Sequence, residues 1–283
     1  MVQGDDPDGG VLLGAVDLMR FFKVESIGND FVLIESGEDY AALATRLCSR
    51  HFGVGSDGLL VVSPLDGGVE MRMFNPDGTE DFCGNGLRCA AVYAVERGWV
   101  GERFHIRHGG RQVDTQVHGS SVSTVIGPAS FAPERVPLAG GAELFRDVLM
   151  VSGKEVQLSS LTTGSTHTII EVDELPDHER FRRISQSLEH HEHFPERTSV
   201  IWVRADDPQN LFIRIWERGV GETLGCGTGS SAAAVVHARG LGRGGTFSVH
   251  NPGGTVQVSL ASWSDEITVS GAARIVYEGV TAE

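Results

Sequence analysis

Two cysteines in this chain each stand directly before a glycine-rich turn. Cys83 begins Cys-Gly-Asn-Gly and Cys226 begins Cys-Gly-Thr-Gly, and each turn leads into a run of apolar and small residues typical of a buried helix. A helix start offers backbone N–H groups that have no intrahelical partner, so glycines there let a carboxylate approach the backbone. The dipole of the helix also favours a thiolate over a thiol. Each motif therefore predicts a reactive thiol beside a carboxylate cradle.

Two such thiols on opposite faces of one ligand could invert a stereocentre. A thiolate would remove the α-proton of an amino acid on one face, and a thiol would return a proton on the other, with no cofactor. The carbanion charge spreads into the carboxylate, where each oxyanion-type donor contributes about 3 to 4 kcal/mol. The residues thus support amino-acid epimerisation. They leave open a protein of another class, in which the thiols serve a non-catalytic redox or binding role.

The elements that must position these thiols are predicted by an internal repeat. Residues 71–75 and 213–217 have the apolar pattern of strands, and each precedes one cysteine motif. The two motifs are separated by about half of the 283 residues. We therefore predict an α/β (α+β) fold with two pseudo-symmetric lobes. Each lobe would be a curved, mostly antiparallel sheet around a central cysteine-led helix, with the active site in the cleft between lobes.

The lobe boundaries follow from the repeat and from a proline-rich stretch that begins at Gly127-Pro128. We expect a disordered leader over residues 1–18, with Met19 as an alternative start. The N-terminal lobe would span residues 19–127, with residues 272–283 returning to it. The C-terminal lobe would span residues 128–271.

Composition limits the partners of the protein. A formal charge of −15 argues against nucleic-acid backbones and anionic membranes. The acidic N-terminus lacks the basic start of a signal peptide, and four cysteines without such a signal indicate reduced thiols. We expect a cytoplasmic protein that binds a small amino-acid substrate and neither nucleic acid nor membrane.

Three further patterns resemble a dinucleotide-binding or metal-binding site but lack the context that such a site needs. Residues 53–58, GVGSDG, match a dinucleotide fingerprint, yet they follow a predicted helix over residues 39–52, capped by Gly53, and precede a strand. The histidine-rich residues 189–194, EHHEHF, are typical of a helix end that leads into a loop. Cys83 and Cys89 have the wrong spacing for a zinc pair. We therefore predict no metal site.

Several segments together resemble the diaminopimelate epimerase family. They are IGNDFVLIE, GVGSDGLLVV, FNPDGTEDFCGNGLRC, FPER and WERGVGETLGCGTGSSAAA. The resemblance extends from about Phe21 to Tyr277. It implies a cofactor-independent isomerase that converts LL-diaminopimelate to meso-diaminopimelate in lysine and peptidoglycan precursor biosynthesis. It also implies a homodimer.

The resemblance assigns roles to individual residues. Cys83 and Cys226 would be the two acid/base residues, with His167 and Glu217 tuning the thiols. Main-chain groups at the two glycine turns would bind the reacting carboxylate, and other side chains would line the substrate site. The implied substrate-binding residues are Asn29, Asn75, Gly84, Asn85, Ser165, Ser199, Arg218, Gly227 and Thr228.

Two serines depart from the family pattern. Ser165 stands where the family usually has the asparagine of Gly-Asn-Pro-His, and Ser199 stands where another asparagine usually follows FPER. Both asparagines would hold the far amino-acid end of diaminopimelate. Arg218 can still hold a distal carboxylate with two hydrogen bonds. The serines leave open a racemase for a different amino acid on the same fold.

Overall fold

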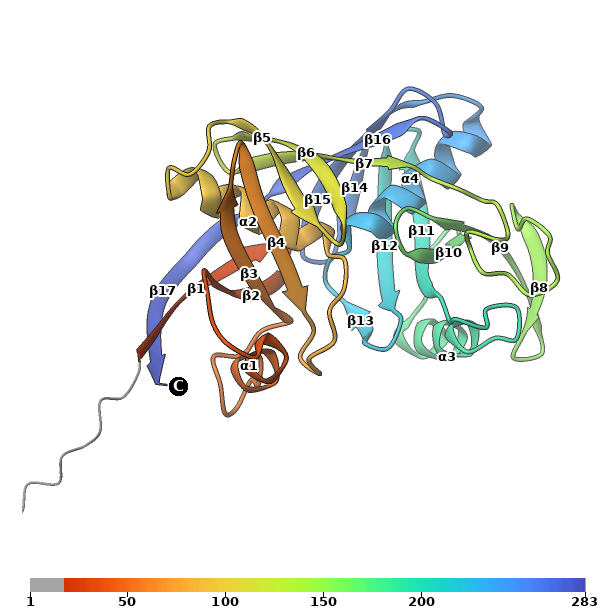
Figure 1. Ribbon diagram of the computed structural model, residues 1–283. Helices are drawn as coiled ribbons and strands as arrows, with labels where there is room; N and C mark the ends of the chain where they lie inside the picture. The colour runs from red at the N-terminus through yellow and green to blue at the C-terminus, as the bar shows by residue number, and fades with distance from the viewer. Residues whose placement is uncertain (1–17, 283) are drawn as a thin grey trace, which may run out of the picture.

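The computed structural model describes residues 18–282, which form seventeen strands and four helices (Figure 1). The expected leader lies outside the described residues except for Leu18, which begins the first strand. The first half contains β1 Leu18–Ser26, β2 Asn29–Ile34, α1 Tyr40–Leu47, β3 Gly58–Leu65, β4 Gly68–Phe74, α2 Gly84–Glu96, β5 Arg103–His108, β6 Arg111–His118 and β7 Ser121–Pro128. The second half contains β8 Asp147–Val151, β9 Lys154–Thr162, β10 Thr166–Glu171, α3 His178–Glu189, β11 Ser199–Asp207, β12 Asn210–Glu217, β13 Gly221–Thr223, α4 Gly227–Leu241, β14 Gly245–Asn251, β15 Gly254–Leu260, β16 Glu266–Ala272 and β17 Arg274–Ala282.

The two halves repeat one order of strand pairing. In the first half, β1–β2 and β3–β4 are antiparallel, β2–β3 and β4–β5 are parallel, and β5, β6 and β7 form an antiparallel meander. Strands β9 to β16 follow the same order, with the short β13 added beside β12. Each helix joins two parallel neighbours, because parallel strands need a crossover connection. The predicted duplication and fold class are confirmed.

The halves are joined through two antiparallel pairings between distant strands. β16 pairs with β7, and β17 returns to pair with β1 (Figure 1). The sheet of the first half curves around α2, which contacts β1 to β4, β6, β7 and β17. The second half curves in the same way around α4, which contacts β9 to β12 and β14 to β16. Each cysteine-led helix is therefore the centre of its own half.

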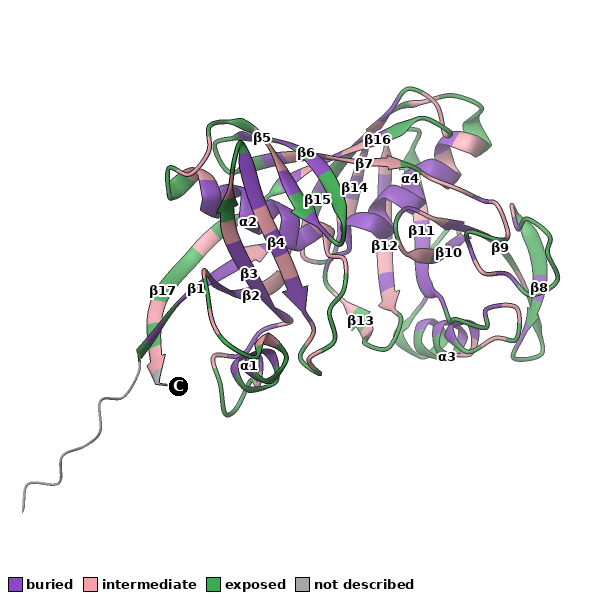
Figure 2. Cartoon of the chain, viewed as in Figure 1, coloured by how far each residue is buried: buried purple, intermediate pink, exposed green. Residues whose placement is uncertain are grey.

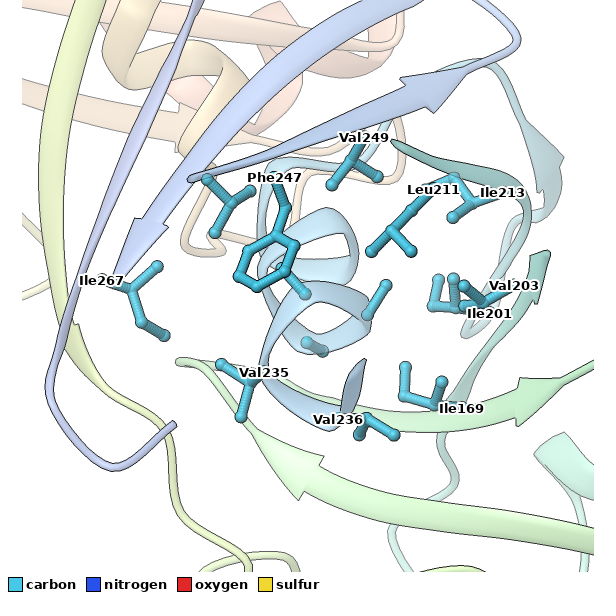
Figure 3. Packing of buried hydrophobic residues seen from close by; sticks show 14 of the residues in the cluster. Ile169, Ile201, Val203, Leu211, Ile213, Val235, Val236, Phe247, Val249 and Ile267 are labelled. Carbon is cyan, nitrogen blue, oxygen red and sulfur yellow. The ribbon is translucent and has the colours of Figure 1, made fainter. Parts of the chain in front are cut away.

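The two central helices are buried along most of their length (Figure 2). Figure 3 shows Val235 and Val236 of α4 among strand side chains that include Ile201, Phe247 and Ile267. A helix that is apolar all round can be stable only when it is covered on every side. The small residues at 232–234 allow the surrounding strands to approach closely. No helix within residues 18–282 is long and apolar enough to cross a membrane.

The helix predicted over residues 39–52 is shorter than expected. It ends at Leu47, with Cys48 as its C-cap, and Gly53 follows in a turn. Gly53 is required for a different reason from capping. A Cβ there would collide with the carbonyl oxygen of Arg46, so only glycine fits. The helix predicted before the histidine-rich residues does end there, at Glu189.

Candidate active site

Cys83 and Cys226 are the N-caps of α2 and α4 and have nearly the same geometry. Their φ and ψ angles are −134° and 108° for Cys83 and −138° and 112° for Cys226. Each Sγ accepts the N–H three residues later, from Gly86 or Gly229, at 3.3 Å. An extended cap residue with an accepting side chain is the usual way to satisfy a helix start. The local sequence therefore fixes both thiols at the positive ends of helices.

The backbone N–H of each cysteine donates to a residue that had no predicted role in the site. Cys83 N–H donates to His108 Nε2 at 2.9 Å, and Cys226 N–H donates to Asn251 Oδ1 at 3.2 Å. His108 and Asn251 end β5 and β14, which hold matching places in the repeat. His108 Nδ1 donates to the Met71 carbonyl at 3.0 Å, so Nε2 is the acceptor. The signal available in the sequence was that His108 and Asn251 stand just before matching glycine pairs, Gly109-Gly110 and Gly253-Gly254.

A chain of amide hydrogen bonds connects the first half to the start of α4. Asn29 Nδ2 donates to Asp57 Oδ2 at 2.7 Å, and Asn85 Nδ2 donates to Asn29 Oδ1 at 3.0 Å. The same Asn85 nitrogen donates to the Gly225 carbonyl at 2.9 Å. Because Gly225 precedes Cys226, this chain brings the starts of the two helices together. The structure thus places Asn29 and Asn85 beside both glycine turns.

His167 and Thr228 lie against the Cys226 thiol. Cys226 Sγ is 3.9 Å from His167 Nε2 and 3.4 Å from Thr228 Oγ1. His167 Nδ1 donates to the Ser165 carbonyl at 2.9 Å, which leaves the Nε2 lone pair facing the thiol. Burial lowers the pKa of His167 to about 4, and the charge of Arg218 acts in the same direction. His167 is therefore a neutral acceptor at ordinary pH.

Burial dominates the titration of both thiols. It raises the pKa of Cys83 and of Cys226 to about 12, and the negative charge of Glu217 adds to the effect. Hydrogen bonds from Gly86 and Gly229 oppose it. Burial therefore favours the protonated thiols in the resting site, which is the direction opposite to the one expected from the helix starts. Burial also raises the pKa of Glu217, whose Oε1 accepts from Thr223 Oγ1 at 2.6 Å.

The turn after β12 carries Arg218 at an exposed position. Its backbone N–H donates to Ser199 Oγ at 3.1 Å, and its Nη1 donates to the Glu196 carbonyl of the FPER segment at 3.0 Å. Ser199 is therefore bonded to the backbone of the arginine turn. Asn75 has a different hydrogen-bond partner: its Nδ2 donates to Thr79 Oγ1 within its own turn at 3.1 Å.

Glu189 is a second kind of residue that sequence reasoning missed. It belongs to the EHHEHF segment, yet it is buried and its carboxylate accepts from Gly219 N–H at 2.8 Å and from Trp216 Nε1 at 2.7 Å. It therefore anchors the turn that presents Glu217 and Arg218. No local pattern distinguishes this carboxylate from its exposed neighbours.

Comparisons with known proteins agree with one another. The family model described as Diaminopimelate epimerase matches residues 21–132 and 159–276. A diaminopimelate epimerase of Caldanaerobacter subterraneus subsp. tengcongensis is 38% identical, with 92% of this chain and 98% of that protein covered. A diaminopimelate epimerase of Desulfitobacterium hafniense is 34% identical, with 94% and 99% covered. A solved structure of a probable proline racemase from Agrobacterium radiobacter shares the fold, with a TM-score of 0.68 at 13% identity, and 93% of each chain is covered.

Proposed function

This chain belongs to the diaminopimelate epimerase family, and from that premise we propose that Cys83 and Cys226 are its two acid/base residues. The chain is an isomerase that epimerises LL-diaminopimelate to meso-diaminopimelate in lysine biosynthesis. The observation that carries the proposal is the matched geometry of the two thiols. Each caps a central helix, and the two helix starts are linked by the Asn85–Gly225 hydrogen bond.

The proposed reaction moves one proton off the α-carbon and one proton onto it. The thiolate of one cysteine takes the α-proton and becomes a thiol, and the thiol of the other cysteine protonates the opposite face and becomes a thiolate. The electron pair left on carbon spreads into the carboxylate, which backbone N–H groups at Gly84–Asn85 and Gly227–Thr228 would bind. The reverse reaction exchanges the two roles.

Formation of the first thiolate needs a proton acceptor, because burial keeps both thiols protonated in the resting site. We propose that His167 Nε2 and the Glu217 carboxylate tune the Cys226 thiol as hydrogen-bond acceptors beside it. The 3.9 Å separation between His167 Nε2 and Cys226 Sγ supports this role for His167. The buried position of Glu217 and its hydrogen bond with Cys226 support a role for Glu217.

The far amino-acid end of the substrate would lie toward the arginine turn. We propose Arg218 as the group that binds the distal carboxylate, and Asn29, Asn75, Ser165 and Ser199 as further parts of the substrate site. The exposure of the Arg218 side chain supports its availability to a ligand. Because the Ser199 hydroxyl accepts the Arg218 N–H, Ser199 would act by holding the arginine in place.

We also propose the finer organisation that the sequence suggested. The two lobes would comprise residues 19–127 with 272–283, and residues 128–271, and the enzyme would work in the cytoplasm and supply peptidoglycan precursors. A homodimer is supported by exposed apolar side chains on β17, Val276, Tyr277 and Val280. These side chains lie on the strand that pairs with β1.

Deuterium exchange tests the function directly. Reduced protein is incubated in heavy water with LL-diaminopimelate, and NMR follows the α-protons. We expect deuterium to enter with epimerisation, and we expect Cys83→Ala and Cys226→Ala each to lower the epimerisation rate by about 10²- to 10⁴-fold. Cys48→Ala is the matched control, since this thiol is buried beside Ser56 in another hydrophobic cluster. Full epimerisation by either active-site variant would overturn the two-cysteine mechanism, and exchange only with another amino acid would overturn the substrate.

A further inference from the structure

Arg88 is a buried cation at the point where the two cysteine-led helices meet. It lies in the second turn of α2 and is 1% exposed. Its Nε donates to Ser26 Oγ at 2.9 Å, and its Nη2 donates to Asn85 Oδ1. A Cβ built on Gly227 would lie 3.2 Å from Arg88 Nη1. The guanidinium therefore donates to the first turn of α2 and lies beside the start of α4.

Within the part of the chain that the structure describes, this charge has no carboxylate partner. None of the ion pairs within residues 18–282 includes Arg88. The ionisable groups that act on it are three thiols, those of Cys83, Cys89 and Cys226. A buried guanidinium without a partner of opposite charge is costly, and burial accordingly lowers the pKa of Arg88. An anion that forms or binds between the helix starts would supply the missing partner.

Only one of the two repeated halves has an arginine at this helix position. The matching position on α4 is Ser231, whose hydroxyl donates to the Gly227 carbonyl at 2.9 Å. The two halves are thus alike in their thiols and differ in the groups around them. Cys226 has His167 and Thr228 beside it, whereas the nearby charge that favours a Cys83 thiolate comes from Arg88.

We propose that Arg88 is a positioning residue that keeps the starts of α2 and α4 in register and supplies the positive charge against which the Cys83 thiolate forms. By donating to Asn85 Oδ1 it fixes the orientation of that amide. Asn85 Nδ2 must then point to Asn29 Oδ1 and to the Gly225 carbonyl, which is the hydrogen bond between the halves. This inference rests on the proposed catalytic role of Cys83.

The charges around the thiols define what a change at Arg88 would do. The negative charge of Glu217 raises the pKa of Cys83, and the positive charge of Arg88 lowers it. The charges of Glu217 and Cys83 both raise the pKa of Cys226. The charges of Arg88, Cys83 and Glu25 also act on the pKa of Cys89. This thiol is buried. Removing the Arg88 charge leaves Glu217 unopposed at Cys83, so its thiolate should become harder to form.

Thiol alkylation without substrate tests the inference. Iodoacetamide is applied over pH 7 to 9.5, and mass spectrometry follows the Cys83 and Cys226 peptides separately. We expect Arg88→Met and Arg88→Gln to slow alkylation of Cys83 about tenfold at each pH, as for a thiol pKa raised by about one unit. Arg88→Lys keeps a positive charge while the buried ammonium stays protonated, so at pH 7 its Cys83 alkylation should be faster than in either neutral variant.

If Arg88 had a purely structural role, its neutral variants would not show slower alkylation of Cys83. Loosening the helix starts would expose Cys83 and leave its alkylation unchanged or faster, and this result in a folded neutral variant would overturn the inference. If both neutral variants unfold, Arg88→Lys at pH 7 decides, because alkylation of Cys83 faster than in the unmodified chain would indicate a loosened helix start and would also overturn the inference. Alkylation requires no substrate, so failure here is distinct from failure of the proposed epimerisation, which deuterium exchange measures.

Discussion

Replacing His167 should make the free energy of unfolding depend less steeply on pH between about pH 4 and pH 6.5. His167 is buried and neutral, with its pKa lowered to about 4 from an ordinary value of 6.5. Between these two pH values the unfolded chain binds a proton that the folded chain does not. The free energy of unfolding therefore falls as pH falls through this window, and the contribution is fully retained above about pH 6.5. We expect the variant His167→Gln to lose this dependence.

The magnitude follows from the size of the shift. Relative to pH 8, His167 should lower the free energy of unfolding by about 2 kcal/mol at pH 5 and by about 3 kcal/mol at pH 4. His108 and His237 also have pKa values lowered by burial, so they act in the same direction. Their contributions are present in both proteins and cancel in the comparison. The lost hydrogen bond to the Ser165 carbonyl is a constant offset that does not vary with pH.

Urea unfolding followed by tryptophan fluorescence at pH 5, 6, 7 and 8 provides the measurement. The difference in unfolding free energy between the unmodified chain and His167→Gln should decrease by about 2 kcal/mol from pH 8 to pH 5. NMR of the His167 ring should show no titration above pH 5. A difference that stays constant across this range would refute the reasoning, because it would mean that His167 keeps an ordinary pKa in the folded chain.

Three further predictions concern the substrate site and the thiols. Arg218→Met should raise KM for diaminopimelate by roughly 10- to 100-fold, the loss of a charge-assisted pair, and steady-state kinetics with an unchanged KM would exclude the proposed contact. Gly229→Ala should cost about 1 to 3 kcal/mol of stability and lower activity. Its Cβ would lie 2.8 Å from Ile201 Cδ1 and 3.3 Å from Cys226 Sγ, whereas a Cβ on Gly101 meets nothing within 4 Å. Thermal unfolding should separate Gly229→Ala from the control Gly101→Ala, and equal melting temperatures would contradict the packing argument. Mild oxidation should inactivate the enzyme reversibly by forming a disulfide between Cys83 and Cys226. Peptide mapping would detect this crosslink, and inactivation without it would count against thiols that face each other.

The sequence by itself determined the local geometry of the two thiols and the architecture that holds them. Cap preference, the glycines after each cysteine and the apolar runs act within a few residues, so Cys83 and Cys226 could be placed at helix starts before any contact was known. The repeat predicted two similar halves because each half must bury its own helix. Helix ends were less predictable, since Gly53 is set by a close approach to Arg46 and not by capping.

Only the tertiary structure decided the environment of those thiols. His108 and Asn251 hold the cysteine N–H groups, Glu189 anchors the arginine turn, and Arg88 lies between the two helix starts. Each of these contacts joins segments that are distant in sequence. Burial has the same non-local origin, and it raises the pKa of both thiols, opposite to the direction expected from the helix starts. Desolvation depends on which parts of the chain close around a group, and no local pattern of residues encodes that.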